Sequence, residues 1–115
     1  MQIIEKVVKV MIDVNKACAL LHKKTKYNYF RWILEMPDLY VIAELSNDGQ
    51  VPCAAPFSVN KRTGKIGVHS FLDYHDDDPD PIPLEVPAQY RFPGEFIIDG
   101  LTKKKNPYYT GNKTK

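Results

Sequence analysis

The spacing of apolar residues near the start of the chain predicts an amphipathic helix. Over residues 3–22 apolar side chains recur at steps of three and four, and charged side chains occupy the intervening positions. This period places the apolar residues on one face of an α-helix. Three lysines follow within residues 23–26, where positive charge complements the helix dipole. The expected core face of the helix consists of Ile4, Val7, Val8, Met11, Val14, Cys18 and Leu21.

The period then changes to that of β-strands. Apolar residues alternate with their neighbours over residues 30–36 and again over residues 39–45, with Pro37–Asp38 as a turn between them. These two runs predict an antiparallel hairpin, with Trp32 as an anchor of the core. Residues 55–60 and 65–71 predict a second hairpin. The expected apolar positions of the first hairpin are Phe30, Trp32, Leu34 and Met36, followed by Leu39, Val41, Ala43 and Leu45.

A helix with one apolar face and a sheet with one apolar face are expected to cover each other. The sequence therefore predicts an α+β fold over residues 1–75, in which an N-terminal helix packs on a four-stranded antiparallel meander. The prolines at positions 79, 81, 83, 87 and 93 disfavour helix and central strand beyond this point. Residues 76–115 are expected to form an extended Pro-rich arm, with one short edge strand at residues 95–99 and a disordered basic tail.

Composition adds limits to this picture. The chain has 115 residues, of which 43% are hydrophobic and 11% aromatic, as in a folded globular protein. No apolar run approaches the roughly 20 residues that cross a bilayer, and the N-terminal segment lacks the unbroken apolar centre of a signal peptide. Two cysteines are too few for a disulfide framework or a cysteine metal site. We therefore expect a cytoplasmic protein without contact to a membrane.

Charge is segregated along the chain although the net charge is only +2. The formal charge is +4 over residues 1–70, −7 over residues 71–100 and +5 over residues 101–115. A protein that binds nucleic acid is typically positive over its whole binding domain. An acidic block between two basic regions instead favours charge-complementary contacts within the chain or with a partner protein.

The acidic block contains the stretch "HSFLDYHDDDPDPIP" at residues 69–83. His69, Asp73 and His75 are metal-ligand types, but neither a His-Glu-x-x-His helix nor a calcium-binding loop is present. Three interpretations stay open, namely a solvated loop, an acidic docking surface and a metal site. The first two are favoured, because consecutive aspartates repel one another, and no metal or other cofactor is expected.

Nucleophilic catalysis has little support in the sequence. Cys18 falls on the apolar helix face, where a thiol is inert, and Cys53 has no histidine placed to act as its base. No phosphate-binding loop, dinucleotide fingerprint or serine elbow is present. "NKRTGK" at residues 60–65 and "KKKNPYYTGNK" at residues 103–113 are basic, but they are typical of a hairpin turn and a soluble tail. The protein is not expected to be an enzyme, and nucleic acid is not the expected partner.

The order of helix, Trp-bearing strand, second strand and "APFSVNKRTGKI" resembles small bacterial toxin-immunity proteins of the YrhB-like kind. The resemblance covers about residues 5–75, and PepSY-like modules share the same strand–"K-x-T-G-K"–strand hairpin. The Pro-rich and basic extension beyond residue 76 has no counterpart in that pattern. The resemblance implies a non-enzymatic protein that binds and neutralises a partner.

These observations predict a protein-binding module, whose partner is another protein or a second copy of the chain. The alternative is a small structural protein of a virion or phage assembly, whose C-terminal arm orders against neighbouring subunits and which resides in the virion. The residues expected to contact the partner are Asp73, Asp76, Asp77, Asp78, Asp80, Tyr90, Phe92, Phe96, Lys103, Lys104, Lys105, Tyr108 and Tyr109.

Overall fold

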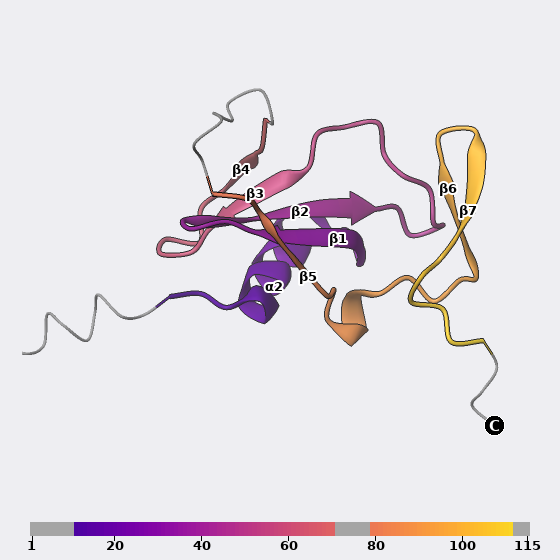
Figure 1. Ribbon diagram of the computed structural model, residues 1–115, viewed down its shortest axis with the longest axis horizontal. Coiled ribbons are helices and arrows are strands. Elements are labelled where there is room, and N and C mark those ends of the chain that lie inside the picture. Colours follow the sequence, from indigo (N-terminus) through magenta and orange to yellow (C-terminus); the bar gives the residue numbers. More distant parts are fainter. Residues whose placement is uncertain (1–10, 71–78, 112–115) are drawn as a thin grey trace, which may run out of the picture.

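The computed structural model of the protein describes residues 11–70 and 79–111, and Figure 1 shows their arrangement. The expected α+β class is confirmed. In chain order the elements are the helix α2 (Val14–Thr25), the strands β1 (Tyr29–Glu35), β2 (Leu39–Leu45), β3 (Phe57–Asn60), β4 (Ile66–Val68) and β5 (Ile82–Leu84), the short 3-10 helix η2 (Ala88–Tyr90), and the strands β6 (Phe96–Asp99) and β7 (Thr102–Lys105).

The main sheet is antiparallel and has five strands in the order β4-β3-β2-β1-β5, where four were expected. The additional strand, β5, comes from the Pro-rich segment, and its Pro83 pairs with Leu34 of β1. A proline cannot donate to a sheet ladder, so it is tolerated at the edge of a sheet, where one side of the strand needs no partner. Prolines therefore did not prevent this segment from extending the sheet.

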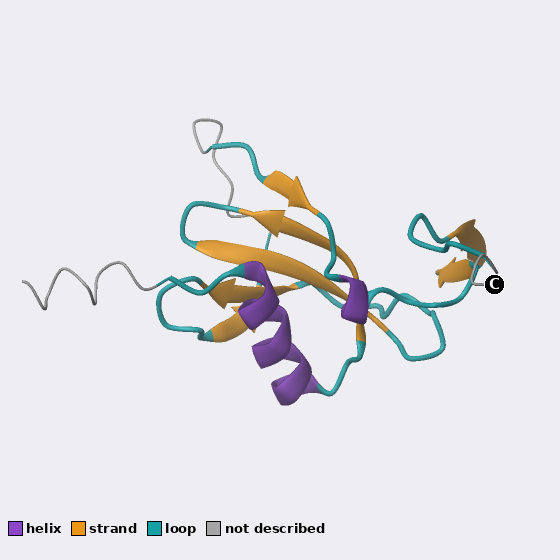
Figure 2. Ribbon diagram, turned by 90° about the horizontal axis from the view of Figure 1, so that it is seen from below, coloured by secondary structure: helices purple, strands orange, loops and turns teal. Residues whose placement is uncertain are grey.

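Helix α2 covers one face of the sheet, as Figure 2 shows, but it is shorter than expected. The prediction that residues 11–13 are helical is wrong, and residues 3–10 lie outside the described residues. Asp13 is extended and its carboxylate accepts a hydrogen bond from the Lys16 N–H at 2.8 Å, so it caps the helix one residue before Val14. At the other end, Lys26 adopts φ 71° and its N–H donates to the His22 carbonyl, which closes the helix after Thr25.

A β-bulge in β1 changes which side chains reach the core. The pairing with β2 shifts register between Phe30 and Trp32, so one residue is added to β1 at this point. Phe30 and Ile33 are consequently both buried in the cluster beneath the helix, whereas Trp32 is only half-buried. The expectation that Trp32 anchors the core is therefore wrong.

Strand β2 is buried on both faces. Tyr40 and Ile42 belong to the cluster that contains Ala17, Cys18 and Leu21 of α2. The four other apolar residues of the strand were expected to face the helix but lie on the opposite face. Val41, Ala43 and Leu45 are fully buried there, whereas Leu39 is half-buried.

The segment after residue 79 is more ordered than the expected extended arm. Val86 is fully buried and belongs to the same core cluster as the helix and the first three strands. Residues 96–99, expected as an edge strand, do not join the main sheet but pair with β7 in a separate two-stranded sheet. Residues 102–105, expected to be disordered, are the second strand of that hairpin. Figure 1 shows the hairpin standing away from the five-stranded sheet at one end of the molecule.

Candidate functional site

The β6–β7 hairpin exposes a concentration of basic and apolar side chains. A two-residue loop, Gly100–Leu101, joins the strands, and Gly100 has φ 67° at the first loop position, as a type II′ turn requires. Leu101 at the tip is fully exposed. All four residues of β7 are exposed as well, and three of them are lysines.

The two faces of the hairpin carry different charges. The Lys103 ammonium lies 4.4 Å from the centre of the Phe96 ring, and Lys105 pairs with Phe96 across the strands. On the other face, the Lys104 ammonium forms an ion pair with the Asp99 carboxylate at 3.1 Å. The Phe96 face therefore carries two lysines without an acidic residue of β6 opposite them, and a ring beside them that is 40% exposed.

Asn106 fixes the base of this hairpin. Its side chain is 2% exposed, and its Nδ2 donates to the carbonyls of Phe92 and Gly94, both at 2.7 Å. Its Oδ1 accepts from the Tyr108 N–H at 3.0 Å, and its own N–H donates to the Glu95 carbonyl. Asn106 therefore joins the chain before β6 to the chain after β7.

A second attachment holds the side of the hairpin. The N–H of Ile98 donates to the Gly49 carbonyl at 2.9 Å, and its carbonyl accepts from the Val51 N–H at 2.8 Å. The Phe92 ring lies against Gly49, where a Cβ atom would come within 2.7 Å of it, and stacks edge-on against Tyr29 at 5.4 Å. The hairpin is thus docked on the turn that follows β2.

A groove of about 400 Å³ lies beside the base of the hairpin and is bordered by Arg91, Phe92, Tyr108 and Tyr109 among others. The Arg91 Nε donates to the Val86 carbonyl at 2.6 Å, and its guanidinium lies 4.8 Å from the centre of the Tyr108 ring. An exposed ion pair links Arg91 to Glu85 at 3.2 Å. Arginine and tyrosine are among the residues enriched at protein–protein interfaces.

Three of the aromatic residues expected to contact a partner point inward instead. The Tyr90 ring packs against Phe30 at 5.4 Å and His22 at 6.1 Å. Tyr108 packs on the core cluster, and its hydroxyl accepts from the Val86 N–H at 3.5 Å. With Phe92 docked on Gly49, these residues attach the C-terminal segment to the sheet, although Phe92 and Tyr108 also border the groove.

Of the other residues predicted to contact a partner, some lie on the β6–β7 hairpin and others lie outside the described part of the chain or elsewhere in the fold. Asp73, Asp76, Asp77 and Asp78 lie outside the described residues. Sequence reasoning missed Arg91, Leu101 and Asn106, although a glycine such as Gly100 at the first position of a two-residue loop is a recognised hairpin signal. We use the term aromatic–basic surface for the exposed hairpin residues Phe96, Leu101, Lys103, Lys104 and Lys105 together with the half-buried groove residues Arg91 and Tyr109.

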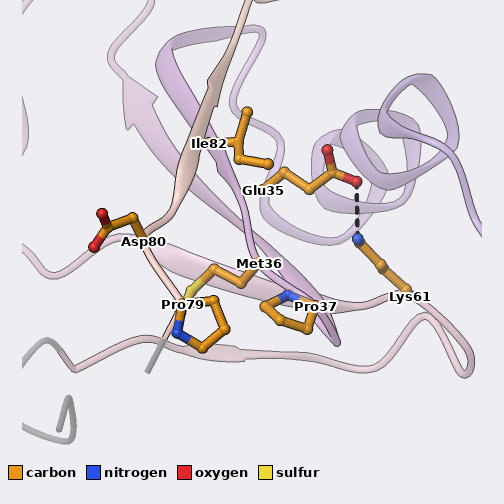
Figure 3. A pocket seen from close by; sticks show the side chains of 7 residues that line it. All are labelled: Glu35, Met36, Pro37, Lys61, Pro79, Asp80 and Ile82. Carbon is orange, nitrogen blue, oxygen red and sulfur yellow. Dashed lines mark hydrogen bonds and ion pairs between the residues drawn. The ribbon is translucent and has the colours of Figure 1, made fainter. Parts of the chain in front are cut away.

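Asp80 lies elsewhere, at a pocket of about 240 Å³ near the start of β5 (Figure 3). The Lys61 ammonium, whose residue is 8% exposed, forms an ion pair with Glu35 at 2.8 Å inside this pocket. Figure 3 shows the Asp80 carboxylate directed away from that pair. Figure 1 places the start of β5 and the β6–β7 hairpin at opposite sides of the sheet, so Asp80 is not part of the aromatic–basic surface.

The Glu35–Lys61 pair has a structural explanation. The Lys61 ammonium also lies 5.1 Å from the centre of the Tyr40 ring, and the Tyr40 hydroxyl donates to the Ile12 carbonyl at 3.1 Å. Burial and the negative charge of Glu35 raise the pKa of Tyr40. The Tyr40 hydroxyl and the Ile12 N–H, which donates to the Lys61 carbonyl at 2.8 Å, fasten the chain before α2 to the sheet, and the ion pair lies beside the Tyr40 ring.

Two further titratable groups lie inside the fold. Burial raises the pKa of the Cys18 thiol to about 12, so this thiol is protonated at neutral pH and a weak nucleophile. Burial also raises the pKa of Glu44, which is 2% exposed, and this effect is opposed by the residue's own backbone N–H and by Arg31. Cys53 is exposed.

Metal-ligand types do not gather in the part of the chain that the structure describes, where no group of three such side chains is present. The proposed ligands Asp73 and His75 lie outside that part. Within residues 11–70 and 79–111, no helix is both long and apolar enough to cross a membrane.

No protein-family model, curated protein sequence or solved structure matches the chain. The aromatic–basic surface must therefore be interpreted from its own chemistry.

Proposed function

We propose that the protein is a non-enzymatic protein-binding module that acts through the aromatic–basic surface. The observation that carries this proposal is the fixed geometry of that surface. Asn106 is a buried polar residue with three side-chain hydrogen bonds, and what it holds in place is mainly exposed. A surface held in its binding geometry loses less conformational entropy when a partner docks.

The composition of the surface favours a protein partner. Leu101 and Phe96 offer apolar contact, Arg91 and Tyr109 offer the mixed apolar and polar contacts common at interfaces, and the lysines of β7 select for negative charge.

The resemblance of residues 5–75 to toxin-immunity proteins suggests that binding neutralises the partner. On this proposal the protein works as an inhibitor in the cytoplasm, and the partner is an acidic protein. No catalytic step is required, because occupying the partner's surface is sufficient for inhibition.

The proposal is tested by affinity capture from the native source with four forms of the tagged protein. Wild type and the control Val68→Ser are expected to retain the same partner, whereas Leu101→Ser and Tyr109→Ala are expected to lose it. Val68 is 68% exposed and lies on β4, in the main sheet, so its substitution removes an exposed apolar residue of similar size outside the proposed surface. Equal recovery of the partner by Leu101→Ser, Tyr109→Ala and wild type would remove the aromatic–basic surface from the interface.

The assembly protein is a second candidate, with less support from the fold. An arm that orders against neighbouring subunits needs residues free of their own chain, but β5 pairs with β1, and Val86 lies in the core. Size-exclusion chromatography at two concentrations, with and without residues 101–115, tests it. Self-association that depends on those residues would favour assembly over a monomeric binding module.

A further inference from the structure

The backbone of β7 has one edge without a described neighbour. In the β6–β7 ladder, Ile98 pairs with Lys103, but the N–H and carbonyl of Ile98 bond to Gly49 and Val51 instead. Ile98 and Lys103 are therefore a non-hydrogen-bonded pair. At the other end of the ladder, the N–H of Asn106 donates to the Glu95 carbonyl, so Glu95 and Asn106 are a hydrogen-bonded pair. Hydrogen-bonded and non-hydrogen-bonded pairs alternate along an antiparallel ladder, so this bond also makes Phe96 and Lys105 a non-hydrogen-bonded pair. It follows that the N–H and carbonyl groups of Lys103 and Lys105 point away from β6.

Other strand edges in the described part of the chain are less suited to pairing. On the main sheet, β4 has three residues, and β5 contains Pro83, which has no N–H to donate. The outer side of β6 is occupied where Ile98 bonds to Gly49 and Val51. In contrast, β7 presents four consecutive residues without proline, all of them exposed.

The side chains at this edge define what can pair with it. Lys103 and Lys105 lie on one face and flank Phe96, while Lys104 lies on the other and is already paired with Asp99. Lysines on an edge strand disfavour pairing with an apolar strand or with a second positively charged strand. Opposite charges across neighbouring strands stabilise their pairing.

We infer that β7 binds an extended acidic segment of the partner protein as an added β-strand. This inference rests on the proposed function and names how that partner is held. The outward N–H and carbonyl groups of Lys103 and Lys105 form the backbone hydrogen bonds, and acidic residues at alternate positions of the segment lie opposite the two ammonium groups. Main-chain hydrogen bonds provide affinity in such strand addition, and alternate side chains provide specificity.

The probe for this inference is an eight-residue peptide that alternates Glu with Thr, titrated into the isotope-labelled full-length protein. An otherwise identical peptide whose Glu residues are N-methylated is the matched control, because it carries the same charge but its Glu residues, which lie opposite Lys103 and Lys105, have no N–H to donate. The Glu–Thr peptide is expected to bind more tightly and to slow hydrogen exchange at the amides of Lys103 and Lys105. The amide of Lys104 faces β6 and is expected to change less.

Two substitutions of Lys103 separate the contribution of its backbone N–H to peptide binding from the contribution of its ammonium charge. Lys103→Thr removes the ammonium group and keeps the N–H, whereas Lys103→Pro removes both. Because the Lys103 N–H is not used by β6, Lys103→Pro leaves the ladder bonds of the hairpin in place, and the exchange of the Lys104 amide, which faces Ile97 of β6, verifies this. Lys103→Pro is expected to bind the Glu–Thr peptide about fivefold more weakly than Lys103→Thr, as loss of one hydrogen bond predicts.

Equal binding of both peptides, or unchanged exchange at Lys103 and Lys105, would overturn strand addition. Tighter binding of an oligothymidylate than of the Glu–Thr peptide would overturn it as well, in favour of nucleic acid. Neither result by itself refutes the proposed function, which is tested separately by the sensitivity of the captured partner to Leu101→Ser and Tyr109→Ala.

Discussion

Asn106 is the residue whose removal tests the architecture of the candidate site most specifically. The substitution Asn106→Ala removes three side-chain hydrogen bonds, two to the carbonyls of Phe92 and Gly94 and one from the Tyr108 N–H. At about 1 kcal/mol for each bond, the attachment of the hairpin weakens by about 3 kcal/mol. That change corresponds to about a hundredfold increase in the population of a locally opened hairpin.

Hydrogen exchange monitored by NMR measures this opening directly. The Ile98 amide, which bonds to Gly49, reports on hairpin docking, and the Val59 amide reports on the main sheet. In Asn106→Ala, exchange at Ile98 is expected to accelerate by up to about a hundredfold, and more than at Val59. Asn28→Ala, at an exposed position, serves as the control. Unchanged exchange at Ile98 in the Asn106 variant would refute the role assigned to this residue.

Three further predictions concern the core. Val86→Ala is expected to lower the free energy of unfolding, measured in urea, by about 2 kcal/mol. The control Val68→Ala, at an exposed position, is expected to lower it by less than about 0.5 kcal/mol. Equal effects of the two substitutions would contradict the burial of Val86 in the Pro-rich segment. Because burial raises the folded-state pKa of Glu44, its protonated form favours folding, and this contribution is lost as pH rises through that pKa. Glu44→Gln is therefore expected to gain stability relative to wild type as pH rises above the ordinary glutamate pKa, and a difference that does not change with pH would contradict this. A thiol reagent is expected to modify Cys53 rapidly and Cys18 only after denaturation, so two fast thiols in the native protein would be inconsistent with the buried Cys18.

The local parts of the fold could be predicted from the sequence. Alternation over residues 30–36 and 39–45, with Pro37–Asp38 between them, predicted the β1–β2 hairpin, and the structure confirms it. The β3–β4 hairpin is confirmed in the same way. Both depend on side-chain period and turn residues, which act over a few positions and are therefore visible in a single sequence.

Features that depend on contacts between distant parts of the chain could not be predicted from the period of the side chains or from turn residues. The bulge between Phe30 and Trp32 adds one residue to β1, and nothing in the alternation marks its position. The apolar period before Val14 suggested a longer helix, yet the capping carboxylate of Asp13 begins the helix there. Prolines at 81 and 83 disfavour a central strand, and β5 is accordingly an edge strand, but nothing in the local pattern marked this segment for pairing with β1.

The candidate site was predicted in part for a similar reason. The lysines of β7 and Phe96 are exposed, as their charge and position after the Pro-rich segment suggested. Composition does not reveal whether an aromatic side chain faces solvent or the core. Tyr90 and Tyr108 were therefore predicted to contact a partner together with the lysines and Phe96, although both pack inward. Asn106 carries no sequence signal, because its role arises only when the chain before β6 and the chain after β7 meet.

The central claim is that the aromatic–basic surface contacts another protein, and site-specific photo-crosslinking in the native source tests it most directly. The photoreactive residue benzoylphenylalanine replaces Tyr109 in one variant and Val68, outside that surface, in the other. The account predicts a discrete adduct with a second protein from position 109 and none from position 68. An adduct from position 68 alone would contradict it.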